Sequence, residues 1–267
     1  MRYWITDSFT DGSFTGAQTL VAFLKAWPTD EMLHKMAMEI PMDCCSFLIP
    51  REDGYDLRWF SENGEEGNMK YTFLGISAVL EKLGKGQDVI SFHTKNGLFQ
   101  AKREGERYII DLGAIPVEPY PLRQDMVDAL GGAVPAEVYK GRDLLFVFEK
   151  QEDVAKIVPD FEKLKALPEG IGTFVSAPGD NEDVVSRAFW PKININEDTV
   201  CGSMQCCIAP LYGKKLGKKT VISRQLSHRG GLLELELRED RVIMRGDVCI
   251  SAEGTFLYPE LEPFAGM

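Results

Sequence analysis

The chain has 267 residues, enough for one large or two ordinary domains, and we expect two. Its hydrophobic content of 44% and charged content of 27% are typical of a folded globular protein, not of a disordered or fibrous one. A net charge of -11 argues against nucleic acid or an anionic membrane as a partner, because both bind through clustered lysine and arginine.

The N-terminus and the cysteines indicate a cytoplasmic protein without a metal. The opening MRYWITDSFTDG lacks the charged start and apolar run of a signal peptide, and no segment has 18 apolar residues in a row. Six cysteines with two adjacent pairs do not form the pattern of a secreted disulfide framework, so we expect reduced thiols. The sequence has no Cys-x-x-Cys motif and its three histidines lie far apart, which argues against a zinc site.

The first half is predicted to alternate strands with two helices. The first helix follows its cap Thr29 and has one apolar face. The second, from Tyr71 to Leu83, is apolar all round and therefore buried; it follows the polar loop Glu62 to Gly67 and ends at Gly84. Alternating apolar residues predict strands over residues 3–9, 18–24, 45–50, 55–60 and 88–94, and a hairpin over 97–110.

The second half repeats this order of loop, buried helix, strand and hairpin. Leu83-Gly84 and Leu216-Gly217 are 133 residues apart, and Arg107 and Arg241 are 134 apart. A chance match of a few positions is the alternative, and the shared order of elements argues against it. The spacing predicts two domains of one design, each a buried helix followed by antiparallel strands. Further elements are expected at 125–130, 144–148, 151–158, 161–167, 171–177 and 186–190.

Three prolines in the segment from Leu112 to Pro121 mark a linker. We therefore expect an N-terminal domain over residues 1–115 and a C-terminal domain over 116–253, with the tail from about 254 returning to the first.

The segment from Asn194 to Gly213 is the strongest candidate for a site. It is expected to form a loop with Glu197 and Asp198, a turn, and then a buried helix that begins near Cys201. The first N–H groups of such a helix can bind an anion, and they would lower the pKa of a thiol placed there. The alternative is that Cys201 is a small buried apolar residue.

The loops Glu62 to Gly67 and Glu197 to Gly202 precede the two buried helices. If the halves face each other, both helix starts converge on one cleft and bind a carboxylate without a dedicated arginine. Acid and base groups beside that cleft could then move a proton at the neighbouring carbon. For Glu65 and Glu66 we prefer a solvated or helix-capping role.

Five segments in order resemble the phenazine-biosynthesis PhzF-like family, relatives of diaminopimelate epimerase: SFTDGSFTGAQTLVAFL, EIPMDCCSFLIP, FSENGEEGNMKYTFLG, NEDTVCGSMQCCIAPLYG and RGDVCISAEGTF. The resemblance implies an α+β fold of two similar domains, each a curled, mostly antiparallel sheet around a central helix. It also implies a homodimer with the site between the domains, and isomerisation or epimerisation of a small carboxylated metabolite without a cofactor.

The family's functional positions carry over in part. Asp198 and Ser203 match its acidic and hydroxyl residues, with Gly202 between them, whereas its acid/base Glu falls on Cys44 and its His on Tyr71. Lys70 replaces the small glycine before that histidine, and Ala17-Gln18 replaces an Asn-Pro. The resemblance thus assigns catalysis to Cys44, Tyr71, Asp198, Cys201 and Ser203, and substrate binding to Gly16, Gln18, Lys70 and Gly202.

Cys201 also resembles a catalytic thiol of the epimerase and proline-racemase relatives, because Val200-Cys201-Gly202-Ser203 is similar to their stretch at this helix start. Their partner thiol falls on Lys70, so Cys44 is the alternative partner. The sequence predicts an isomerase or epimerase. The alternatives are a PhzF-like protein that has lost catalysis and binds a small molecule, or a structural partner protein.

Overall fold

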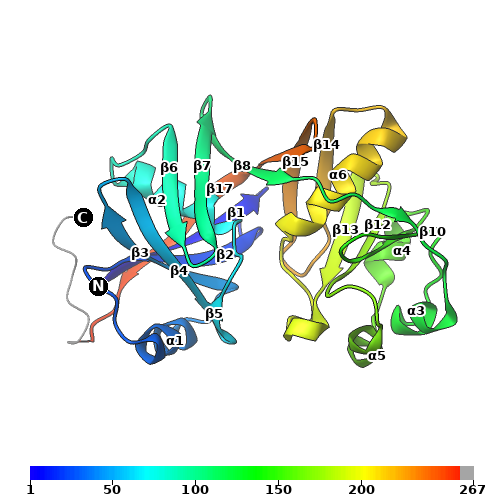
Figure 1. Cartoon of the computed structure of the whole chain (residues 1–267), viewed down its shortest axis with the longest axis horizontal. Helices are drawn as coiled ribbons and strands as arrows, with labels where there is room; N and C mark the ends of the chain where they lie inside the picture. Colours follow the sequence, from blue (N-terminus) through cyan, green and yellow to red (C-terminus); the bar gives the residue numbers. More distant parts are fainter. Residues whose placement is uncertain (259–267) are drawn as a thin grey trace. The chain divides into compact units, whose positions relative to one another are not determined.

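The computed structural model describes residues 1–258, which form two compact units (Figure 1). Unit 1 contains Met1–Ile110 and the chain from Arg245 onward, and unit 2 contains Asp111–Met244. From the sequence, the chain was expected to return to the first domain only from about residue 254. In the structure, strand β17 (Asp247–Thr255) already pairs with β1 (Arg2–Thr10) along its length, because its register runs from Asp247 opposite Thr10 to Thr255 opposite Arg2.

The sheet of unit 1 is mostly antiparallel. The pairs β2–β3 and β4–β6 are parallel, and the other pairs between neighbouring strands of this unit are antiparallel. Part of the loop expected over Glu62 to Gly67 is a short strand that pairs with the end of β4, so that expectation is corrected. After β1, the strands are β2 (Ala17–Phe23), β3 (Cys44–Arg51), β4 (Gly54–Ser61), β5 (Gly64–Glu66), β6 (Val89–Thr94), β7 (Gly97–Glu104) and β8 (Arg107–Gly113).

Helix α2 (Thr72–Lys82) is the buried centre of unit 1, as its apolar sequence predicts. The Phe73 ring stacks on Phe92 with 4.7 Å between ring centroids, and the Trp59 indole N–H donates to the Thr72 hydroxyl at 2.9 Å. Helix α1 (Asp30–Glu39) buries only one face, and the expected cap is confirmed because the Thr29 hydroxyl accepts the Met32 N–H.

Unit 2 is built in the same manner. Its pairs β11–β12 and β13–β14 are parallel, while β9–β10, β10–β11, β12–β13 and β14–β15 are antiparallel. The strands are β9 (Glu118–Pro119), β10 (Glu137–Lys140), β11 (Leu144–Val147), β12 (Thr173–Ala177), β13 (Val184–Phe189), β14 (Thr220–Gln225), β15 (Gly231–Arg238) and β16 (Arg241–Arg245). The short helices are α3 (Gln124–Ala129), α4 (Gln151–Lys156), α5 (Phe161–Ala166) and the 3-10 turn η1 (Pro191–Ile193).

Helix α6 (Gly202–Leu216) is the buried centre of unit 2 and ends at Gly217, whose φ of 66° is left-handed (Figure 1). Pro210 lies inside this helix and has no N–H for the Cys206 carbonyl one turn earlier. The Ile115 N–H of the linker donates to that carbonyl instead, at 2.9 Å. The linker therefore supplies the Cys206 carbonyl with the hydrogen bond that Pro210 cannot donate.

These observations confirm the α+β class, with a curled, mostly antiparallel sheet around a central helix in each unit. Antiparallel and parallel pairs alternate in the same order along β1, β2, β3, β4, β6 and β7 of unit 1 as along β10 to β15 of unit 2. A true internal repeat stays a prediction. Within residues 1–258, no helix is both long and apolar enough to cross a bilayer.

Gly75 lets α2 approach the sheet. A Cβ on Gly75 would lie 2.1 Å from the Thr6 hydroxyl oxygen of β1, and Thr6 is fully buried. Overpacking lowers the free energy of unfolding by about 1 to 3 kcal/mol. The higher helix propensity of alanine relative to glycine raises it by at most about 1 kcal/mol. We therefore expect Gly75→Ala to lower the free energy of unfolding in urea, and Thr6→Ala in the same chain to restore part of it.

Gly12→Ala is the matched control, since a Cβ there meets nothing within 4 Å and the φ of Gly12 is not positive. Equal urea unfolding midpoints for Gly75→Ala and Gly12→Ala would contradict the close approach of α2 to β1.

Candidate functional site

The segment before α6 is fixed by the side chain of Gln225, the last residue of β14. Its Oε1 accepts the Cys201 N–H at 2.7 Å, and its Nε2 donates to the Asp198 carbonyl at 2.5 Å. The Asp198 N–H also donates to the Ala188 carbonyl of β13 at 2.9 Å. The loop with Asp198 and the helix start are thus tied to the same sheet.

The two acidic residues of this loop have different surroundings. Glu197 accepts two hydrogen bonds from Arg187, at 2.7 Å from Nε and 2.8 Å from Nη2. Arg187 also donates to the Ile157 carbonyl at 2.7 Å, so this ion pair anchors the loop to unit 2. Asp198 is half-buried beside the helix start, and its carboxylate interacts with the Cys201 thiol.

Helix α6 begins directly after Cys201, close to where it was expected, and Cys201 caps it because its Sγ accepts the Met204 N–H at 3.4 Å. The Ser203 hydroxyl lies 3.5 Å from the same sulfur. The expectation of a lowered thiol pKa is wrong. Burial raises the pKa of Cys201 well above its usual value, the charge of Asp198 raises it further, and the hydrogen bonds from Ser203 and Met204 lower it by less. Cys201 is only 3% exposed.

Arg142 joins this group of residues, and sequence reasoning missed it. Its Nη2 donates to the Ser203 hydroxyl oxygen at 3.2 Å, across 61 residues of sequence. Its Nε donates to Asp143 at 2.5 Å, and its guanidinium carbon lies 5.5 Å from the centroid of the Trp190 ring. The only sequence signal is an Arg-Asp pair directly before the apolar strand β11. We call Arg142, Asp198, Cys201, Gly202 and Ser203 the unit 2 cluster.

In unit 1 the structure brings Gln18, Tyr71 and the residue before Cys44 together. The Tyr71 hydroxyl donates to the Gln18 carbonyl at 3.4 Å, and the Gln18 N–H donates to Asp43 Oδ2 at 3.0 Å. Gly16, two residues before Gln18, has a φ of 87°, and a Cβ there would lie 2.6 Å from the Ser8 carbonyl oxygen. We call Gly16, Gln18, Asp43, Cys44 and Tyr71 the unit 1 cluster.

Cys44 is fully buried at the start of β3. Its thiol donates to the Cys45 carbonyl at 3.7 Å. Burial raises the pKa of Cys44 well above its usual value, and the nearby Cys45, Glu66 and Asp43 raise it further. Cys44 therefore holds its proton near neutral pH, as Cys201 does.

Lys70, Glu65 and Glu66 of unit 1 each contact a further side chain. The Lys70 ammonium lies 4.6 Å from the centroid of the Phe99 ring. Glu65 pairs with Arg58 at 2.9 Å, and Glu66 accepts the Ser61 hydroxyl at 2.6 Å, so each has a partner on the sheet. The convergence of the two helix starts on one cleft stays a prediction.

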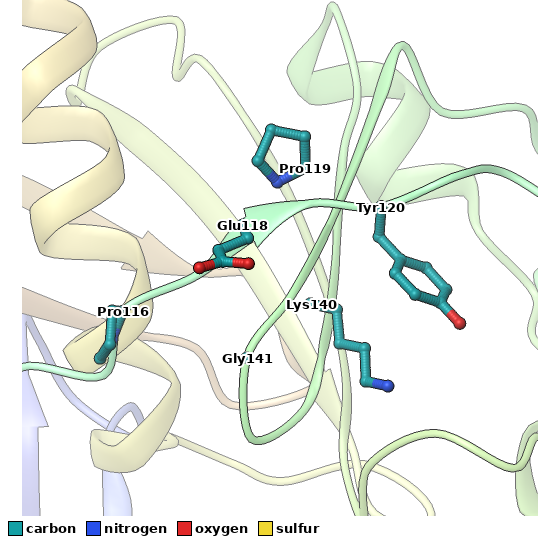
Figure 2. A pocket seen from close by; sticks show the side chains of 6 residues that line it. All are labelled: Pro116, Glu118, Pro119, Tyr120, Lys140 and Gly141. Carbon is teal, nitrogen blue, oxygen red and sulfur yellow. The ribbon is translucent and has the colours of Figure 1, made fainter.

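A pocket of about 460 Å³ lies in unit 2, and its lining contains none of the predicted site residues (Figure 2). The Lys140 ammonium lies 5.1 Å from the centroid of the Tyr120 ring, and both side chains extend to the same side of the β9–β10 ladder. Among residues 1–258, no three His, Cys, Asp or Glu side chains are grouped so as to hold a metal ion. The pocket lining is Pro116, Glu118, Pro119, Tyr120, Lys140 and Gly141.

Comparison with known proteins agrees with the motifs. The family model described as "Phenazine biosynthesis-like protein" (PhzC-PhzF) matches residues 6–254. An uncharacterized isomerase of Pseudomonas aeruginosa is 35% identical over 93% of this chain and 96% of its own length. A crystal structure of a PhzF-family phenazine biosynthesis protein from Enterococcus faecalis has a TM-score of 0.90 and 36% identity, over 96% of this chain and 99% of that one.

A more distant structure extends the likeness of fold. It is a hydroxyproline epimerase from Agrobacterium vitis with bound trans-4-hydroxy-L-proline, which has a TM-score of 0.58 at 12% identity and covers 95% of this chain and 91% of its own. At this identity the likeness concerns the fold alone. The motifs, the match over nearly the whole chain and the E. faecalis structure together show that this chain belongs to the phenazine biosynthesis-like (PhzF) family.

Proposed function

We propose that this chain is an isomerase or epimerase that shifts a proton on a small carboxylated metabolite without a cofactor. Family membership and the relative named as an isomerase support this class of reaction. We further propose that it works as a cytoplasmic homodimer with its two clusters facing one cleft. Its partner is then a small metabolite, and neither nucleic acid nor a membrane takes part.

The arrangement at the start of α6 carries the proposal. The N–H groups of Gly202 and Ser203 donate to no other residue between 1 and 258, and they lie in the first turn of a buried helix. Such groups stabilise the negative charge that develops when a proton leaves the carbon beside a carboxylate. Asp198 stands at the same helix start, held through its carbonyl by Gln225. A base and a charge-stabilising site are therefore adjacent.

Asp198 is a better proton carrier than either thiol. A thiol must lose its proton before it can act as a base, and the raised pKa values of Cys201 and Cys44 keep the thiolate scarce at neutral pH. The Asp198 carboxylate is only half-buried and lies at the same helix start. We therefore assign the proton transfer of unit 2 to Asp198, with the Ser203 hydroxyl as a neighbouring donor.

A second candidate is a binding protein that has lost catalysis. It is favoured by Cys44 and Tyr71 at the positions of the family's Glu and His, because the buried Cys44 thiol replaces a carboxylate there. Both candidates predict ligand binding, and only the first predicts exchange of a carbon-bound hydrogen.

Solvent exchange tests the reaction. Incubation in deuterium oxide with malonate, succinate and trans-4-hydroxy-L-proline, followed by proton NMR, should show loss of a carbon-bound hydrogen signal for at least one carboxylate. Since general-base catalysis contributes about 10²- to 10⁴-fold, Asp198→Asn should slow that exchange by at least about 100-fold at nearly unchanged KM.

Asp180→Asn, an exposed carboxylate between β12 and β13, is the control and should retain the wild-type rate. Ligand binding without exchange by the wild type would favour the binding protein.

Alkylation tests the role of the thiols. In the native protein at pH 7, iodoacetamide should modify the exposed Cys249 first and leave Cys44 and Cys201 largely unmodified. Each unit by which a pKa is raised lowers the thiolate fraction about tenfold at a pH below both values. The Cys201 rate should therefore still be rising with pH at pH 9, without a plateau.

Protein unfolded in urea is the control, and there all six cysteines should react at similar rates. Rapid native alkylation of Cys201 at pH 7, blocked by a carboxylate, would instead support a thiol mechanism.

A further inference from the structure

Arg142 is held in one position although 41% of its side chain is exposed. The neighbouring Asp143 carboxylate is fully buried, and its Oδ1 accepts the N–H groups of Ile171 at 3.0 Å and Gly172 at 2.9 Å. Its Oδ2 accepts Arg142 Nε, and the Trp190 ring lies under the guanidinium. A planar group fixed by a buried carboxylate on one edge and an aromatic ring on one face keeps its direction.

The Nη2 group of Arg142 contacts both Asp143 and the start of α6, because it also lies 2.5 Å from Asp143 Oδ2. Nη2 donates to the Ser203 hydroxyl oxygen at 3.2 Å, while Nη1 donates to no residue between 1 and 258. Arginine has no acceptor, so the Ser203 oxygen accepts this bond and its own proton is left for Cys201 Sγ or for a bound molecule.

Arg142 and the helix start together carry several hydrogen-bond donors. They are Nη1 and Nη2 of Arg142, the Ser203 hydroxyl, and the N–H groups of Gly202 and Ser203, which also donate to no described residue. Arginine suits a carboxylate because the spacing of its N–H groups matches the two oxygens. The charge of Arg142 is balanced by Asp143, which contacts Nε and Nη2. Because Nε keeps its bond to Asp143, Nη2 can exchange Ser203 for a ligand oxygen and Nη1 can donate to the same ligand while the anchor stays in place.

We propose that Arg142 binds the carboxylate of the substrate and thereby selects anionic substrates for the unit 2 cluster. This inference rests on the proposed function, because it names the residue that recognises the group next to the reacting carbon. It also replaces the expectation from sequence that the helix starts bind the anion without a dedicated arginine. Ser203, held by Arg142, then directs its proton to the bound anion.

Kinetics of the exchanging carboxylate provide the first test. Loss of a hydrogen bond to a charged group is worth about 10- to 100-fold in affinity. Arg142→Gln should therefore raise KM by that factor while kcat changes less than about threefold. Arg142→Lys should recover part of the loss, because the charge returns without the paired N–H groups.

Arg238→Gln is the matched control, since Arg238 lies in the same unit, is 43% exposed and pairs with Glu236 on the surface. Its KM should equal that of the wild type. An Arg142→Gln enzyme with wild-type KM would overturn the proposal.

The wild-type protein provides a test that does not depend on Arg142→Gln, which removes the ion-pair partner of the buried Asp143. Protein labelled with ¹⁵N-arginine is titrated with malonate, succinate and trans-4-hydroxy-L-proline, and with the carboxamide of each. One guanidinium signal should shift with a carboxylate and not with its amide, and that signal should be missing in Arg142→Lys. A wild type in which no arginine signal responds to these carboxylates, or one whose responding signal persists in Arg142→Lys, overturns the proposal.

The outcomes also separate this inference from the proposed function. Hydrogen exchange that is independent of Arg142 contradicts only the role of Arg142. Carboxylate binding that depends on Arg142, without exchange of any hydrogen, supports this role and contradicts the proposed isomerase.

Discussion

The site of unit 2 depends on the side-chain amide of Gln225. This buried amide accepts the N–H that begins α6 and donates to the carbonyl of Asp198, so one group sets both the helix start and the loop before it. Gln225 is itself fixed, because it ends β14 opposite Ser186 of β13. The positions of Asp198 and Cys201 are therefore properties of the sheet, and a flexible loop could not hold a base beside a helix start with comparable accuracy.

The burial that fixes α6 also decides which of its groups can act. A helix start stabilises a thiolate when water still reaches the sulfur, but Cys201 is 3% exposed, and desolvation outweighs the hydrogen bonds from Ser203 and Met204. Close packing around α6 thus favours a protonated thiol, while the half-buried Asp198 stays accessible. The thiol then serves as a cap that satisfies the Met204 N–H.

Local patterns predicted most of the fold, because periodicity and capping are properties of neighbouring residues. The helices from Thr72 and Gly202 and their glycine-marked ends follow from apolar runs and local signals. The site was predicted less well because its contacts join distant segments. The pairing of Glu197 with Arg187, the bond from Arg142 to Ser203 and the desolvation of Cys201 depend on which strands become neighbours. No spacing in the sequence contains that information.

The two clusters share one chemical arrangement despite their different residues. Each places a fully or nearly buried thiol close to a more exposed carboxylate: Cys44 follows Asp43, and Cys201 lies near Asp198. In both, the charge of the carboxylate adds to burial in raising the thiol pKa, so the carboxylate helps to keep the thiol protonated. Proton transfer through sulfur would require removing a thiol proton that burial and the neighbouring charge both hold in place. Proton transfer through the carboxylate does not require the thiol to lose its proton. The sulfur atoms therefore shape the two clusters, and the carboxylates are the groups suited to exchange a proton with a ligand.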